Sequence, residues 1–136
     1  MAEKRTIFCC GCNKETWVRL TDGTEIYPHR SDLAELPFWK CDACGNHVGC
    51  HHKTRNRTRP LGCIPTKEVK NARQHIHRIL DPLWKDGLIS RGKAYKRVAR
   101  TIGVEEYHTA EIRSVEEART VYRAVLQLRQ ELVEAQ

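Results

Sequence analysis

The chain lacks the features that define several protein classes. It has no apolar run long enough to cross a bilayer, no signal-like segment at its start and no internal repeat. It also has no glycine-rich loop of the kind that cradles phosphates, and no serine or cysteine hydrolase signature. We therefore expect a soluble cytoplasmic protein without a membrane partner. We assign no catalytic residues and favour a function other than catalysis.

Cysteine is the residue type that stands out. The chain has seven cysteines in 136 residues, an odd number, and a reducing cytoplasm disfavours disulfides. Four of them form two pairs with two residues between the members, Cys9/Cys12 and Cys41/Cys44, and 28 residues separate the pairs. Such a pair can bend into a knuckle that directs both sulfurs at one ion, and four thiolates complete a tetrahedral structural site. The spacing therefore predicts bound Zn²⁺.

Two details of this ligand set follow from the residues nearby. Cys10 can compete with Cys9 for the ion, but the equal spacing of the two pairs favours Cys9. Gly45 follows the second pair, where the turn behind a metal-bound cysteine favours a residue that tolerates positive φ. Cys10, Cys50 and Cys63 have no common ligand spacing and are expected to be ordinary reduced thiols.

The pattern of elements predicts an α+β fold, with an N-terminal zinc ribbon followed by a small C-terminal helical bundle. We divide the chain into a ribbon over residues 1–50, a basic segment over residues 51–65 that serves as arm or linker, and a helical module over residues 66–136. We expect the ribbon and the module to pack as one unit. The first ~60 residues can bury little core, so zinc would supply much of their stability, on the order of 10 kcal/mol.

Turn and cap residues give the expected elements. In the ribbon we expect strands over Thr16–Leu20 and Glu25–Tyr27 joined at Asp22-Gly23, a helical turn within Ser31–Leu36, and a core formed by Trp17, Phe38 and Trp39. In the module we expect a helix over Lys67–Leu80 that Pro82 interrupts, with Asp81-Pro82 as the cap of a short helical turn that Gly87 closes. We expect a further helix over Arg91–Ile102, between Ser90 and Gly103. A capping box at Ser114–Glu117 opens a long final helix with an apolar stripe.

Positive charge is concentrated in the middle of the chain. Residues 50–100 hold 14 lysines and arginines against three acidic residues, a formal charge of +11, whereas residues 1–49 carry −1 and residues 101–136 carry −3. Potential cations occupy alternate positions of the basic segment: His51, Lys53, Arg55, Arg57 and Arg59. In an extended arm they would project to one side, as a phosphate backbone requires. A second basic face is expected on the Arg91–Ile102 helix: Lys93, Lys96, Arg97 and Arg100.

A further set of polar residues forms a candidate secondary site. Its members are His51, Arg73, His77, Asp81 and His108. Such residues can serve metal or acid–base chemistry in small nucleases. We favour the simpler interpretation that they cap helices, pair or touch phosphates, because His77 and Asp81 are four apart and can meet on a helix.

The order of short motifs along the chain resembles a family of small bacterial and phage proteins described only by the zinc finger they contain. The motifs are Cys9-x2-Cys12, Tyr27-Pro28, Trp39-x-Cys41-x2-Cys44, Val48-Gly49-x-His51, Pro60-Leu61-Gly62, Arg73-x3-His77-x3-Asp81-x2-Trp84, Ser90-Arg91-x2-Ala94-Tyr95 and His108. The resemblance implies zinc on the two cysteine pairs and a phage or prophage setting in a bacterial host cell. It carries no catalytic assignment. The chain departs from the family pattern between His51 and Pro60, where the basic run resembles an insertion.

Three functions are consistent with these features. The leading hypothesis is a zinc-binding protein that binds the backbone of nucleic acid, DNA or RNA. The alternative is a protein-interaction module, such as a phage factor that binds or inhibits a host or defence protein through the apolar stripe of the last helix. A small metal-dependent nuclease is the third.

Overall fold

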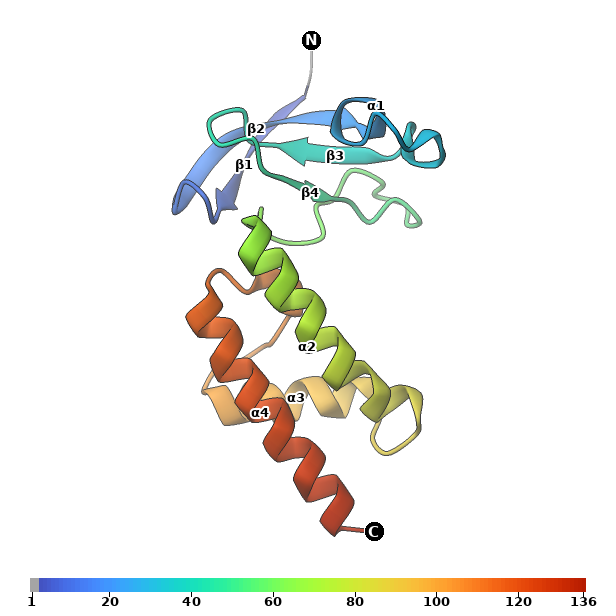
Figure 1. Ribbon diagram of the computed structural model, residues 1–136, viewed down its shortest axis with the longest axis vertical. Helices are drawn as coiled ribbons and strands as arrows, with labels where there is room; N and C mark the ends of the chain where they lie inside the picture. The colour runs from blue at the N-terminus through green and yellow to red at the C-terminus, as the bar shows by residue number, and fades with distance from the viewer. Residues whose placement is uncertain (1–2) are drawn as a thin grey trace. The chain divides into compact units, whose positions relative to one another are not determined.

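The computed structural model describes residues 3–136 and has the expected α+β architecture (Figure 1). The chain divides into two compact units, the first ending at Lys67 and the second beginning at Glu68. The first contains a four-stranded sheet and the second contains the long helices. That the two units pack as one stays a prediction.

The sheet of the first unit is an antiparallel meander in the order β1-β2-β3-β4 (Figure 1). Its strands are β1 (Lys4–Cys9), β2 (Lys14–Asp22), β3 (Pro37–Lys40) and β4 (His47–Gly49). Each tight connection, from β1 to β2 and from β3 to β4, contains one of the cysteine pairs. The meander therefore places both pairs in hairpin turns.

One face of this sheet carries the core of the first unit. Alternation along the strands turns Ile7, Val18, Trp39 and Val48 to this face, where Ile64 packs with them. Trp39 and Ile64 are fully buried. The chain beyond β4 thus returns to cover the sheet.

The expectation that Trp17 joins this core was wrong. Its side chain is 70% exposed, because neighbouring Val18 takes the inward position on β2 and successive residues of a strand face opposite sides. Phe38 is buried on the outward side of the sheet, where its ring meets Tyr27 and His47 edge-on at 5.6 and 5.8 Å. Of the three expected core aromatics, Trp39 alone lies in the core cluster.

The prediction of a strand over Glu25–Tyr27 was also wrong, because the chain forms the short helix α1 (Gly23–Ile26) directly after β2. The Asp22 side chain accepts a hydrogen bond from the Thr24 amide at 3.0 Å and caps this helix. A Cβ atom on Gly23 would lie 1.8 Å from the Leu33 carbonyl oxygen, so only glycine fits there. The expected helical turn follows as the 3-10 helix η1 (Ser31–Leu33).

The second unit consists of three long helices and one 3-10 turn. These are α2 (Lys67–Lys85), α3 (Arg91–Ile102), η2 (Thr109–Glu111) and α4 (Val115–Glu134). Along α4 the buried residues are Ala118, Val121, Ala124, Val125 and Leu128. The apolar stripe of the last helix is therefore largely covered within its own unit. No helix in residues 3–136 is both long and apolar enough to span a membrane.

Pro82 does not interrupt the first of these helices. The expected break at Asp81 is absent, and α2 continues to Lys85 through the proline. Proline in a helix interior removes one backbone hydrogen bond. Leu80 and Leu83, on either side, are 0% and 3% exposed, so their burial favours the helical path over the break.

The predicted caps of α3 and α4 are confirmed. The Ser90 hydroxyl accepts a hydrogen bond from the Lys93 amide at 3.2 Å, and Gly103 ends α3 in the left-handed conformation. Ser114 accepts from the Glu117 amide at 3.1 Å. The Glu117 carboxylate reaches back to the amide of Arg113, one residue before the position that a standard capping box uses.

Candidate metal centre and nucleic-acid interface

Four cysteine sulfurs gather at one end of the sheet. The Sγ atoms of Cys9, Cys12, Cys41 and Cys44 all lie within 4.8 Å of one another. Cys9 and Cys44 are 3.3 Å apart, and Cys12 and Cys41 are 3.7 Å apart. Zinc bound to four sulfurs at about 2.3 Å holds them about 3.8 Å from one another. Both the donor set and the spacing therefore fit a zinc ion.

The hairpins explain why these sulfurs meet. Cys9 ends β1 and Cys12 precedes β2, while Cys41 follows β3 and Cys44 precedes β4. β1 and β3 flank β2 in the meander, so the two turns lie at the same end of the sheet. The structure places Cys9 in the cluster, and Cys10 directs its sulfur to Cys63 at 3.9 Å.

The two knuckles share a positive φ at the residue that follows the second cysteine. Asn13 and Gly45, each one residue after the second cysteine of its pair, have φ of 56° and 80°. In the second knuckle the Gly45 amide donates to the Cys41 carbonyl at 2.7 Å, and the Asn46 side chain donates to Cys44 Sγ at 3.2 Å. The first of these hydrogen bonds closes the turn, and the second stabilises negative charge on the Cys44 sulfur.

The electrostatics of the sulfurs differ with burial. Burial raises the pKa of the Cys9 and Cys41 thiols, and backbone N–H groups of their own knuckles offset only part of this effect. Burial also acts to raise the pKa of Cys44. The backbone N–H of Asn46 and hydrogen bonds from the other cysteine thiols outweigh this effect and lower the pKa. Because thiolates at Cys9 and Cys41 are costly alone, a divalent cation would compensate them and release protons on binding.

An ion-pair network braces the second knuckle against the sheet. Arg19 of β2 donates to Asp42 at 2.6 Å and to Glu25 at 2.5 Å, and Lys40 contacts Glu25 at 2.9 Å. These hydrogen bonds, from Arg19 first, lower the pKa of the Glu25 carboxyl. The cations of this part of the ribbon are thus neutralised internally.

The basic segment forms a closed loop instead of the expected extended arm. The His51 amide donates to the Arg59 carbonyl at 2.8 Å, and Cys50 and Pro60 form an antiparallel bridge. The indole N–H of Trp39 donates to the Thr58 carbonyl at 2.6 Å. These contacts hold residues 51–59 on the ribbon, so their alternation does not place the cations on one side of a strand.

The cations of this loop nevertheless face solvent. All four are exposed, and none forms an ion pair within residues 3–136: Lys53, Arg55, Arg57 and Arg59. Arg57 donates a hydrogen bond to the His52 carbonyl at 3.2 Å. The loop therefore presents positive charge that the described part of the chain does not neutralise.

The basic face of α3 is partly engaged inside the second unit. Lys93, Lys96 and Arg100 are exposed and unpaired in residues 3–136, whereas Arg97 forms an ion pair with Glu131 of α4. Three of the four expected cations on this helix are thus available to an external anion.

Among the described residues of the second unit, two members of the candidate secondary polar site are in contact with each other. His77 and Asp81 do meet, with Nδ1 3.2 Å from the carboxylate. Arg73 is buried and donates to the Ile112 carbonyl at 3.1 and 2.6 Å, while His108 lies beside Glu106 at 3.6 Å. His51 belongs to the first unit. In the residues that the structure describes, the four-cysteine cluster is the one group suited to a metal.

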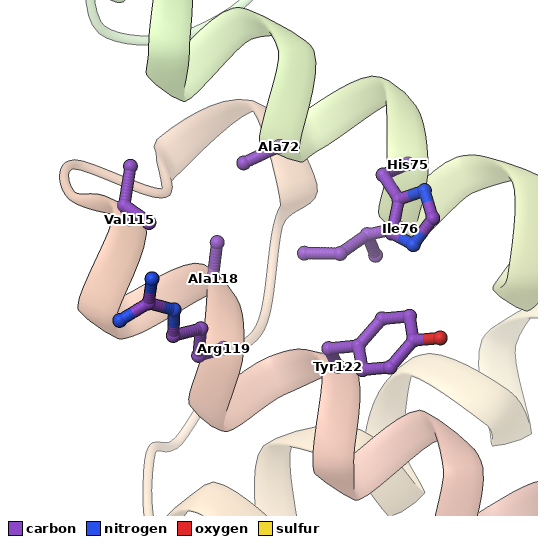
Figure 2. Close-up of a pocket in the computed structure, with 7 residues that line it drawn as sticks. All are labelled: Ala72, His75, Ile76, Val115, Ala118, Arg119 and Tyr122. Atoms are coloured by element: carbon purple, nitrogen blue, oxygen red, sulfur yellow. The ribbon is translucent and has the colours of Figure 1, made fainter.

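An apolar hollow lies between α2 and α4 and was not foreseen from the sequence. It measures about 200 Å³, and Figure 2 shows Ala72, His75 and Ile76 of α2 opposite Ala118, Arg119 and Tyr122 of α4, with Val115 at its end. The rings of His75 and Tyr122 stack, with their centroids 5.1 Å apart. The hollow arises from the way the faces of α2 and α4 pack, and no local sequence motif predicts it.

Trp17 is a second exposed feature that the sequence interpretation missed. It lies on the outward face of β2 opposite Thr6 of β1. The signal was present in the alternation of β2, where Val18 and Leu20 face inward. An exposed indole can stack on a nucleic-acid base.

Comparisons with known proteins agree with this architecture. No curated protein and no solved structure matches the chain significantly. A family model described as a zinc-finger-containing domain matches residues 5–131, and so covers both the ribbon and the helical module. With its four-cysteine cluster, this chain belongs to the family of zinc-finger-containing domains.

Proposed function

We propose that this protein binds Zn²⁺ at its four-cysteine cluster and binds the phosphate backbone of DNA or RNA through its basic segment, in a phage or prophage setting. The observation that carries the proposal is the loop at residues 51–59, with four exposed cations and no acidic partner in residues 3–136. Phosphates are the anions that such an array binds most strongly, because each contact releases condensed counterions.

The contrast with the rest of the ribbon supports this proposal. Arg19 and Lys40 are paired with Glu25 and Asp42, as expected of charges that stabilise a fold. Lys53, Arg55 and Arg59 form no such pairs within the described chain. Exposed charges of one sign repel one another and destabilise a compact state. A bound external anion would reduce this repulsion, which no acidic residue of the described chain reduces by an ion pair.

Zinc would contribute to binding indirectly, by stabilising the sheet to which the basic loop is attached. The loop is anchored to Trp39, and Trp39 stands two residues before the ligand Cys41. Loss of the metal would release the knuckles and the sheet that carry the loop. Binding of nucleic acid is therefore expected to depend on zinc even though zinc does not contact the phosphates.

The test is a salt titration of the zinc-loaded protein against random-sequence duplex DNA, single-stranded DNA and RNA, beside elemental analysis. We expect one zinc per chain and an affinity that falls steeply with salt, with little sequence preference. Removal of zinc by a chelator, or Cys44→Ser, should abolish binding and unfold the first unit. Absence of binding to all three nucleic acids at low salt would overturn the proposal.

A second candidate, a protein-interaction module, has the hollow between α2 and α4 in its favour. An apolar hollow of about 200 Å³ that opens to solvent can accept a partner side chain. Ala72→Arg would place a charge at this site. It should abolish binding of a protein partner and leave nucleic-acid affinity unchanged. The burial of the apolar stripe on α4 weakens the original basis of this candidate.

A further inference from the structure

Two cysteines outside the metal cluster lie side by side although 53 positions separate them in the chain. The Sγ atoms of Cys10 and Cys63 are 3.9 Å apart. Neighbouring backbone groups hold the two segments together: the Cys10 amide donates to the Ile64 carbonyl at 2.8 Å, and the Ile64 amide donates to the Phe8 carbonyl at 2.9 Å. A disulfide bond is about 2.0 Å long, so the two sulfurs need to approach by about 2 Å. Rotation about the side-chain bonds can supply much of this movement.

The two thiols differ in access to solvent. Cys63 is 3% exposed, whereas Cys10 is partly exposed on the first knuckle. A small oxidant would therefore meet Cys10 first. Cys50 is a natural comparison, because it is also buried and has no cysteine sulfur within 4 Å among residues 3–136. Burial raises the pKa of Cys50 to about 11, which keeps it protonated and slow to react.

We propose that Cys10 and Cys63 are an oxidation site that forms a reversible disulfide on reaction with a hydroperoxide. The Cys10 thiolate attacks one peroxide oxygen and breaks the O–O bond, which gives a sulfenic acid and, from hydrogen peroxide, one water. The Cys63 thiol then displaces the hydroxyl from the Cys10 sulfur as a second water and forms the S–S bond. Two thiols are oxidised and one hydrogen peroxide is reduced to two waters. A dithiol reverses the step.

This site leaves the metal ligands untouched. The sulfurs of Cys9, Cys12, Cys41 and Cys44 take no part in the bond, so zinc stays in place. The disulfide links the first knuckle to the end of the basic segment, where two backbone hydrogen bonds now join them. A bond that closes so long a loop restricts the unfolded chain and stabilises the fold that holds the metal. Formation of this disulfide does not require bound nucleic acid.

The experiment adds hydrogen peroxide stepwise to the full-length, zinc-loaded protein. Intact mass should fall by about 2 Da, peptide mapping should place the disulfide between Cys10 and Cys63, and released zinc should stay at background. EDTA should then remove zinc about tenfold more slowly than from the reduced protein. Zinc release that accompanies the first oxidation, or a first disulfide between other cysteines, would overturn the proposal.

Single substitutions sharpen this test. Cys50→Ser should form the same disulfide at the same rate. Cys63→Ser should instead accumulate a sulfenic acid at Cys10 that dimedone traps, because the resolving thiol is gone. If Cys63→Ser fails to fold, Cys10→Ser supplies the comparison and should show no loss of 2 Da at the peroxide dose that oxidises the wild type. An unchanged oxidation product in either variant contradicts the assignment.

Discussion

Asn13 and Gly45 occupy equivalent positions in the two metal knuckles, each one residue after a cysteine ligand and each with positive φ. Gly45 has open space where a side chain would stand, so backbone conformation alone selects glycine there. Asparagine is one of the few other residues that adopt this conformation readily. Both halves of the metal site therefore use a left-handed residue directly after the second cysteine.

This symmetry predicts the effect of alanine in the second knuckle. Gly45→Ala should lower the free energy of unfolding of the zinc-loaded protein by about 1–2 kcal/mol, because a Cβ atom disfavours the left-handed conformation. Asn13→Ala should act in the same direction. Denaturant titration measures both. Gly92→Ala, within α3 and with open space around it, is the control and should be neutral or stabilising. Equal effects at Gly45 and Gly92 would contradict the account of the knuckles.

Tyr107 predicts how the second unit responds to alkaline pH. Burial raises the pKa of this phenol above its usual value of about 10, while its hydrogen bond with Thr109 acts in the opposite direction. The folded state therefore keeps the proton at a pH where the unfolded chain loses it. Stability from the neutral phenol is complete below pH ~10 and is lost as the pH rises through the folded pKa, by at most about 1.4 kcal/mol per pH unit.

Tyr107→Phe removes this titration. The variant should be less stable at pH 7 by about 1 kcal/mol, since the hydrogen bond to Thr109 is lost. Its free energy of unfolding should then fall less steeply than that of the wild type above pH 10. Equilibrium unfolding at several pH values between 8 and 11 measures the difference, and parallel curves would show that Tyr107 has no such role.

The exposed indole of Trp17 predicts a preference among nucleic acids. If a base stacks on it, Trp17→Ala should weaken binding of single-stranded nucleic acid by about 1–3 kcal/mol. Binding of duplex DNA, whose bases are already stacked, should change little. Titration of both probes at one salt concentration makes the comparison. An equal loss for duplex and single strands would assign Trp17 to the stability of the ribbon.

Local signals in the sequence were sufficient where the structure depends on local chemistry. The cysteine spacing predicted the four-sulfur cluster, and the caps at Ser90 and Ser114 depend on hydrogen bonds three residues away. The second knuckle was also foreseen, because the demand for positive φ at Gly45 comes from the turn itself. These features required no knowledge of distant contacts.

The errors arose where distant contacts decide the outcome. Asp22-Gly23 is a good hairpin turn by composition, but the backbone of Leu33 packs against Gly23 and Asp22 caps a helix. Pro82 remains in a helix because its neighbours are buried. The alternation of the basic segment indicated a strand, whereas the bond from Trp39 to Thr58 holds a closed loop. The hollow between α2 and α4 depends on two helix faces that no single segment reveals.

Phosphate binding by the basic segment can be tested with two variants that lose the same charge. One replaces the four exposed cations of the loop with serine: Lys53, Arg55, Arg57 and Arg59. The other replaces four exposed cations of the helical module: Arg78, Lys85, Arg123 and Arg129. Both reduce the net charge of +7 by four, so a general electrostatic effect would act on them alike.

The measurement is the slope of log affinity against log salt for duplex DNA. We expect the loop variant to lose about 0.9 units of slope for each phosphate contact removed, and the helical-module variant to keep the wild-type slope. Equal slopes for the two variants, or a larger loss in the helical-module variant, would contradict the claim that the basic segment binds the phosphate backbone.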